Sequence, residues 1–183
     1  GARYVNLNGS VNNVCGEYGI KIRNNASYSF NYAPGYSNCI SIKNDARHVT
    51  ISGVQFEIAD RGINFDNNTA SQGSDSITIA CNKFMVRTDS MNTNCYPYGI
   101  TFDHNGVVNP TAKSNDITMQ YNKFENMNTG IYLFEGVSGA MTISNNHFYR
   151  NSGNSPGPSF QQFIQSSKPI NLLIDQNFFG GSS

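Results

Sequence analysis

Several features that mark common protein classes are scarce or absent in this chain of 183 residues. Tryptophan is absent, only 13% of the residues are charged, and the net charge is zero. A nucleic-acid-binding surface needs clustered lysine and arginine, so the composition argues against a nucleic-acid partner. The sequence has no run of about 18 apolar residues, which argues against a membrane-spanning helix. Its 12 phenylalanines and its aliphatic segments argue against disorder.

Cysteine is also scarce, and no Cys-x-x-Cys pair occurs, so a zinc or thioredoxin-type site is not indicated. The four cysteines allow three pairings, among which the sequence does not choose. One option is a bridge between Cys81 and Cys95 that pins the loop between them, and the alternative is four free cysteines packed as small apolar residues. The cysteines are Cys15, Cys39, Cys81 and Cys95.

Histidine is scarce as well, with His48, His104 and His147 far apart in the sequence. None of them is paired with another ligand at the spacing of a metal site. We therefore expect no metal and no other cofactor.

One motif of eight residues recurs five times. Each copy is apolar at its first, third and eighth positions, four copies have Thr second, and four have Asn sixth. The copies are residues 49–56, 77–84, 117–124, 141–148 and 172–179. Apolar residues at the first and third positions are typical of a strand with one buried face. Self-similarity at this scale predicts a stack of like units.

Two positions of this motif predict columns that run through the stack. The sixth position predicts a bend, because Asn tolerates left-handed backbone and forms local hydrogen bonds. Stacked coils would align these amides as a ladder formed by Asn82, Asn122, Asn146 and Asn177. The eighth position predicts a buried aromatic column. It would contain Phe56, Phe84, Phe124, Phe148 and Phe179.

A second motif, Gly-Ile-polar-apolar, interleaves with the first. It begins at Gly19, Gly62, Gly99 and Gly130. The gap between the two motifs is longer before Gly99, so we expect an inserted surface loop there. We expect residues 1–183 to form a single domain. The lack of polar caps at its ends fits either a fragment of a longer chain or contact with other chains.

Repeats of the form Val-Thr-Ile-x-x-Asn-x-Phe followed by Gly-Ile-x-Leu resemble the single-stranded right-handed parallel β-helix of the pectate-lyase-like fold. The resemblance covers roughly residues 38–179 and implies an all-β solenoid of about six coils with loop insertions. The scaffold carries lyases, hydrolases, epimerases, phage tailspikes and adhesins, so it does not fix a function. The calcium-binding aspartates and arginine base of pectate lyases are not matched, nor are the paired-aspartate motifs of polygalacturonases.

Within this fold, the polar and weakly charged chain looks most like a phage tailspike or tail-fibre domain. That resemblance implies recognition, with or without depolymerisation, of a bacterial surface polysaccharide. It also implies a homotrimer on the virion surface or in the extracellular space. Two alternatives stay open, namely a free secreted polysaccharide lyase or glycoside hydrolase and a non-catalytic structural or adhesive β-helix.

Candidate catalytic residues follow the Gly-Ile motif. Asp66 and Asp103 come after it by the same count, so adjacent coils would bring them together, facing outward. Two carboxylates about 5 Å apart suit a retaining glycosidase. The alternative is that both aspartates end strands and cap turns. Tyr132 lies in the same outward column and would flank the groove.

Candidate binding residues lie in two further places. The seventh positions of the first motif place Lys83, Lys123 and His147 in an outward row, which would hold an anion such as the carboxylate of a uronic or sialic acid. The alternative is solvated lysines that splay apart. Tyr96 and Tyr98 sit beside the insertion, and a tyrosine-rich segment covers residues 27–38. Tyrosine side chains can pack against a sugar ring, and they can equally cover the apolar edge of the first coils.

Overall fold

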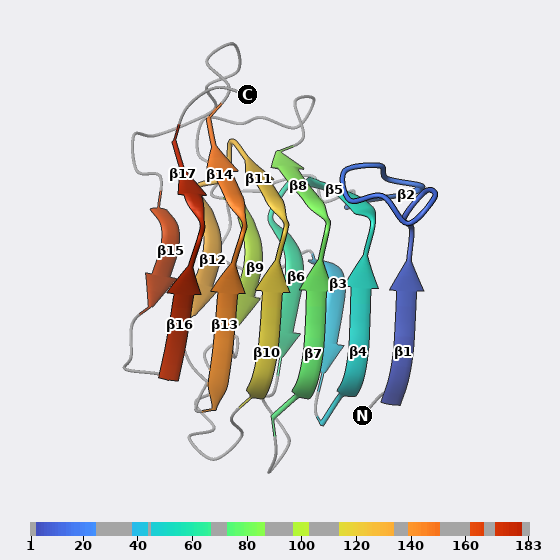
Figure 1. Ribbon diagram of the computed structural model, residues 1–183, viewed down its shortest axis with the longest axis vertical. Coiled ribbons are helices and arrows are strands. Elements are labelled where there is room, and N and C mark those ends of the chain that lie inside the picture. The colour runs from blue at the N-terminus through green and yellow to red at the C-terminus, as the bar shows by residue number, and fades with distance from the viewer. Residues whose placement is uncertain are drawn as a thin grey trace, which may run out of the picture.

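The computed structural model describes residues 3–24, 38–43, 45–66, 73–86, 97–102, 114–133, 139–150, 162–166 and 171–180. These residues form strands and turns and contain no helix. The strands stand side by side in parallel layers along the molecule (Figure 1). The predicted all-β class is therefore confirmed for this part of the chain.

The strands form three sheets. Sheet 1 contains β1 (Arg3–Asn8), β4 (Arg47–Ser52), β7 (Asp75–Ala80), β10 (Asn115–Gln120), β13 (Ala140–Ser144) and β16 (Asn171–Asp175). Sheet 2 contains β2 (Ile20–Arg23), β5 (Val54–Ile58), β8 (Lys83–Val86), β11 (Lys123–Glu125), β14 (His147–Tyr149) and β17 (Phe178–Phe179). Sheet 3 contains β3 (Asn38–Lys43), β6 (Arg61–Asp66), β9 (Tyr98–Phe102), β12 (Thr129–Leu133) and β15 (Gln162–Ser166).

The chain passes through sheets 1, 2 and 3 in turn and then returns to sheet 1 beside its previous strand. The paired strands are parallel, and their register aligns the copies of the first motif. Ile117 pairs with Ile77 on one side and with Met141 on the other, as the repeat predicts. This arrangement of strands stacked in register is compatible with a parallel β-helix.

The phenylalanine column lies inside the stack. The ring centroids of successive members are 4.8, 4.8, 4.6 and 5.2 Å apart, and each pair is stacked. Four of the five rings are buried, whereas Phe179 on the edge strand β17 is 45% exposed. The column expected from the eighth position of the motif is confirmed.

The asparagine ladder is also present, with hydrogen bonds to both side chains and backbone. The Oδ1 atom of Asn122 accepts hydrogen bonds from the backbone N–H and the Nδ2 of Asn82, both at 3.0 Å. Asn122 in turn donates from Nδ2 to Asn146 Oδ1 at 3.0 Å and to the carbonyl oxygen of Ile79 at 2.8 Å. Each inner amide thereby joins three coils, and the ladder continues to Asn177.

The bend differs from the prediction in one respect. The residue with left-handed backbone is at the fifth position of the motif, one before the asparagine. The fifth-position φ angles are 64° at Gly53, 58° at Cys81, 56° at Tyr121, 55° at Asn145 and 51° at Gln176. At two copies the asparagine side chain spans this bend, since Asn146 Nδ2 donates to the carbonyl oxygen of Ser144 and Asn177 Nδ2 to that of Asp175, both at 3.0 Å. These hydrogen bonds oppose the cost of about 1–2 kcal/mol that left-handed backbone has for a residue other than glycine.

The second motif forms the strands of sheet 3 at three of its four copies. Ile100 pairs with Ile63 and with Ile131. The glycine before Ile100 is required by close packing, because a β-carbon on Gly99 would lie 2.5 Å from the carbonyl oxygen of Gly130. The copy at Gly19 is the exception, since the Ile20 after it pairs with Val54 in sheet 2. The loop expected before Gly99 falls on residues 87–96, outside the described residues.

A disulfide joins Cys15 to Cys81, with Cα atoms 5.0 Å apart. Cys15 belongs to the segment between β1 and β2, and Cys81 is the left-handed residue after β7. The sulfur of Cys15 also lies 4.0 Å from the carbonyl oxygen of Tyr121, one coil further on. The bridge between Cys81 and Cys95 considered from the sequence is therefore wrong. Cys39 is half-buried on β3, and Cys95 lies outside the described residues.

The disulfide is expected to stabilise the stack. It closes a loop with a sequence separation of 66 residues, which restricts the unfolded chain and is worth about 2–4 kcal/mol. Replacing both Cys15 and Cys81 with serine should lower the free energy of urea unfolding by that amount. Dithiothreitol should lower the stability of the wild type to the level of the double variant and leave the variant unchanged. Equal stability of the oxidised wild type and the variant would contradict this account.

Candidate functional site

The outward side chains of sheet 3 form a row in the predicted register. Asn64 pairs with Thr101, and Thr101 pairs with Tyr132. The neighbours Ile100 and Phe102 on the same strand belong to the core, so alternation points Thr101 away from it. The expected column is confirmed, but Asn64 and Thr101 are both fully buried and do not face water.

Hydrogen bonds explain how this polar row is accommodated. Thr101 Oγ1 donates to Asn64 Oδ1 at 2.6 Å, and Arg61 Nη1 donates to the same oxygen at 3.4 Å. The Nδ2 atom of Asn64 is buried and has no hydrogen-bond partner among the described residues. The Asn64 amide nitrogen is therefore a hydrogen-bond donor that the described residues leave unused. A buried polar atom without a partner costs about 1–3 kcal/mol of stability.

Asp66 occupies the predicted column but not the predicted environment. It is only 5% exposed, its Oδ2 lies 3.7 Å from Lys43 Nζ, and its Oδ1 is buried without a hydrogen bond within the described ranges. The expectation that Asp66 faces solvent is therefore wrong, because an outward direction on a strand does not ensure exposure. Asp103 lies outside the described residues, so the carboxylate pair stays a prediction.

Two tyrosines do come together on this side of the molecule. The rings of Tyr98 and Tyr132 lie 5.4 Å apart with an interplanar angle of 32°. Both are half-buried at positions on neighbouring strands, β9 and β12. Tyr98 and Tyr132, two of the candidate binding residues, therefore lie next to each other, whereas Tyr96 and residues 27–37 lie outside the described residues.

The basic row on sheet 2 also has the predicted register, since Lys123 pairs with Lys83 and with His147. The positive charge that this row offers to a ligand is smaller than the sequence predicts, because a carboxylate lies against one of its lysines. Lys83 Nζ lies 2.9 Å from Glu125 Oε2, and Tyr149 donates its hydroxyl hydrogen bond to the same oxygen at 3.2 Å. Lys83 is therefore engaged by a carboxylate, in contrast to the free cation that an anion site would use.

Electrostatic effects on this face follow from burial and from neighbouring charge. Burial, with a smaller contribution from the Lys123 charge, lowers the pKa of His147, so the imidazole is neutral at pH 7. Burial and the Glu125 carboxylate raise the pKa of Tyr149, which keeps its hydroxyl protonated. The hydrogen bond from Lys21 lowers the pKa of Glu57, which also lies 2.9 Å from Arg23.

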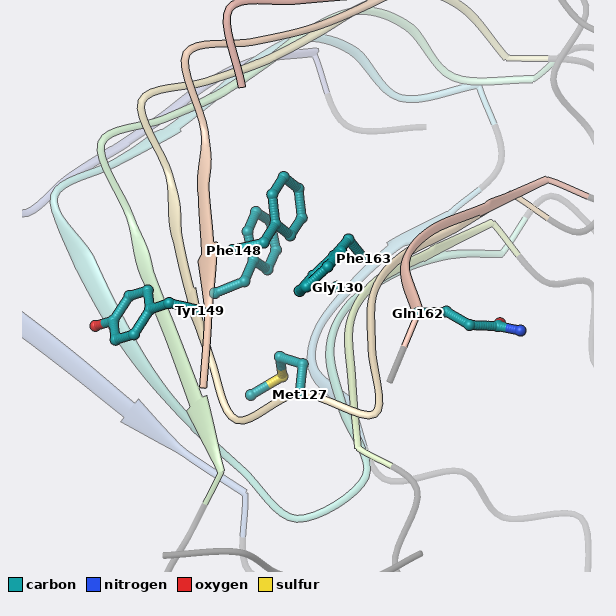
Figure 2. Close-up of a pocket in the computed structure, with 7 residues that line it drawn as sticks. Met127, Gly130, Phe148, Tyr149, Gln162 and Phe163 are labelled. Carbon is teal, nitrogen blue, oxygen red and sulfur yellow. The ribbon is translucent and has the colours of Figure 1, made fainter. Parts of the chain in front are cut away.

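The candidate residues do not converge on one site. Figure 2 shows Tyr149 on β14 and Gln162 on β15 pointing away from the interior in opposite directions. Through Thr129, Gln162 lies in the same row as Tyr98, and Tyr149 pairs with Glu125 beside Lys123. The tyrosine pair and the basic row therefore belong to different faces of the molecule. The sequence could not show this, because the spacing of the motifs predicts which residues align on neighbouring strands but not the direction in which each sheet faces.

The interior pocket in Figure 2 does not qualify as a ligand site. Phe148, Phe163 and Met127 contribute apolar side chains to it, and Gly130 contributes only backbone. The polar ends of Gln162 and Tyr149 are directed outward in the same view. A ligand pocket needs a few convergent polar groups, and the two polar side chains among the described lining residues do not converge on this space.

The part of the chain that the structure describes contains no cluster of three side chains able to hold a metal ion. Within the same residues, no helix is long and apolar enough to span a membrane. Neither protein-family models nor curated proteins match the sequence, and no solved structure matches the fold.

Proposed function

We propose that this chain is a right-handed parallel β-helix of about six coils that binds a bacterial surface polysaccharide in the manner of a phage tailspike. The cyclic passage through three parallel sheets supports the helix. The right hand is supported by the strong preference of parallel crossover connections for that hand. The proposal includes a homotrimer, which sedimentation of the purified protein would test.

The observation that carries the proposal is the tyrosine pair beside a polar row. Tyr98 and Tyr132 offer half-buried rings 5.4 Å apart, and tyrosine combines an apolar face with a hydroxyl. Asn64 and Asp66 on the same sheet are buried, so the tyrosine pair is the part of this row that a ligand can reach. A sugar has apolar C–H faces and hydroxyl groups, which complement the ring faces and hydroxyls of these tyrosines.

The disulfide supports a location outside the cytoplasm. Disulfides such as Cys15–Cys81 form and persist in oxidising environments, including the extracellular space and virion surfaces. This is the compartment in which a surface polysaccharide would be met.

Whether cleavage accompanies binding depends on Asp66 and Asp103. As a pair on adjacent coils they would act as the carboxylates of a glycoside hydrolase. Burial of Asp66 and its contact with Lys43 favour the non-catalytic alternative, in which the domain only recognises the glycan. A free secreted polysaccharide lyase or hydrolase would differ by being monomeric with a deep groove over this sheet.

The test is a screen of capsular and O-antigen polysaccharides. We expect Tyr132→Ala to weaken binding of the recognised glycan about tenfold, because an aromatic anchor contributes at least about 1.4 kcal/mol. Tyr121→Asn is the matched control, since it removes a 52% exposed tyrosine from the bend after β10 and asparagine tolerates the left-handed backbone there.

Cleavage of the polysaccharide is measured in the same screen as the release of reducing ends. Loss of release in Asp103→Asn with an unchanged melting temperature would assign catalysis to the pair, whereas release retained by both aspartate variants would eliminate it. Asp66→Asn must be checked for folding, because Asp66 is buried. Failure of every polysaccharide to bind, or equal binding by Tyr132→Ala and the wild type, would overturn the proposed function.

A further inference from the structure

The outer face of sheet 2 carries four long cationic side chains, three of which lie against a carboxylate. Lys21 and Arg23 lie 2.8 and 2.9 Å from Glu57, and Lys83 lies 2.9 Å from Glu125. Lys123 is exposed, and no described carboxylate lies within ion-pair distance of it. Among the lysines and arginines on the described strands of sheet 2, Lys123 is thus the one whose charge is available to a ligand.

The neighbours of Lys123 supply the other parts of a sugar-binding surface. His147 is its partner on the next strand, and Phe178 is the partner of His147 on the strand after that. The Phe178 ring is 55% exposed and meets the imidazole edge-on, with centroids 4.6 Å apart. Phe178 lies on the edge strand β17, where its exposed ring provides an apolar platform.

The imidazole of His147 adds a hydrogen-bonding group that the described residues leave unused. Its Nε2 atom is buried and has no hydrogen-bond partner among the described residues. The ring lies between Tyr149, at a centroid distance of 4.7 Å, and Phe178.

We propose that Lys123, His147 and Phe178 form a subsite for the carboxylate and ring of an acidic sugar, so that the polysaccharide bound by this protein is anionic. The inference rests on the proposed function for the class of ligand. It differs from the set of binding residues predicted from the sequence, because Glu125 engages Lys83 and Phe178, the next member of the same row, is added. The subsite is separate from the tyrosine pair, which lies on another sheet.

The charge of the sugar can be tested with three acidic oligosaccharides, namely trigalacturonate, a hyaluronan tetrasaccharide and a trimer of sialic acid. Each is compared with its carboxyl methyl ester, which keeps the shape and removes the charge. We expect at least one acid to bind about tenfold more tightly than its ester, since a charge-assisted hydrogen bond is about twice as strong as a neutral one. The NMR signals of the His147 ring should shift with the acid.

The variant Lys123→Gln should lose the preference for the acid, with binding about tenfold weaker. Lys21→Gln is the matched control, because Lys21 is also an exposed lysine on sheet 2 but lies against Glu57. The proposal is overturned if no acid binds better than its ester, or if the two lysine variants bind alike. Neutral polysaccharide binding that depends on Tyr132 would then leave the proposed function standing, so the two failures are distinguishable.

Discussion

Replacing Phe124 with alanine is expected to lower the free energy of unfolding by about 3–5 kcal/mol, the usual cost of emptying a buried aromatic site. The ring is 2% exposed and is stacked between Phe84 at 4.8 Å and Phe148 at 4.6 Å. The column is held on both sides by coils of fixed spacing, so neighbouring rings have little freedom to collapse into the space. Urea unfolding followed by circular dichroism measures the change.

The matched control is the preceding residue. Lys123 is exposed and has no ion-pair partner among the described residues, so Lys123→Ala should change stability by less than about 0.5 kcal/mol. The two substitutions alter the same strand and differ only in the side of the sheet that they affect. A large loss from Lys123→Ala together with a small loss from Phe124→Ala would mean that the interior and exterior of sheet 2 have been assigned the wrong way round.

The core and the register were predictable because they depend on periodicity alone. Apolar residues at the first, third and eighth positions recur with the same spacing in each coil, so Ile77, Ile117 and Met141 must align if the coils stack. A slip by one residue would turn the apolar residues outward and the charges inward, which is costly. The sequence therefore specifies one register strongly.

The environment of the outward residues was not predictable in the same way. Alternation gives the side of the sheet on which Asn64 and Asp66 lie, but burial depends on everything that packs against that side. The ion pair between Lys83 and Glu125 joins adjacent strands diagonally, and side-chain reach, which motif spacing does not describe, decides it. For these residues the sequence predicted correctly which side chains align on neighbouring strands, but it did not predict their burial or their ion pairs.

The disulfide shows a third kind of limit. Cys15 lies in a segment that belongs to neither motif, so no repeat register places it against Cys81. Four cysteines with no distinctive spacing leave three pairings, and only the path of the segment between β1 and β2 selects one. Contacts between a repeat and a non-repeated segment are thus the hardest to predict from the sequence.

The asparagine ladder gives the second large expected effect. Asn122→Ala should lower the free energy of unfolding by about 2–6 kcal/mol, because it leaves the backbone N–H of Asn82 and the carbonyl of Ile79 buried without the hydrogen bonds they now make, at about 1–3 kcal/mol each. Asn122 is 1% exposed, so water cannot readily replace the lost amide. Chemical denaturation measures the total loss.

Hydrogen exchange locates the loss within the ladder. In Asn122→Ala, exchange of the Asn82 amide should accelerate, whereas the Asn146 amide keeps its acceptor, Asn177 Oδ1 at 2.9 Å, and should change less. Asn6→Ala, at an exposed asparagine on β1, is the control and should change stability by less than about 0.5 kcal/mol. If the two variants were equally stable, the ladder would be a consequence of the stacked coils and would contribute little to holding them together. A large loss confined to Asn122→Ala, with faster exchange at Asn82, would show that the sixth-position asparagine stabilises the contact between coils through its side chain.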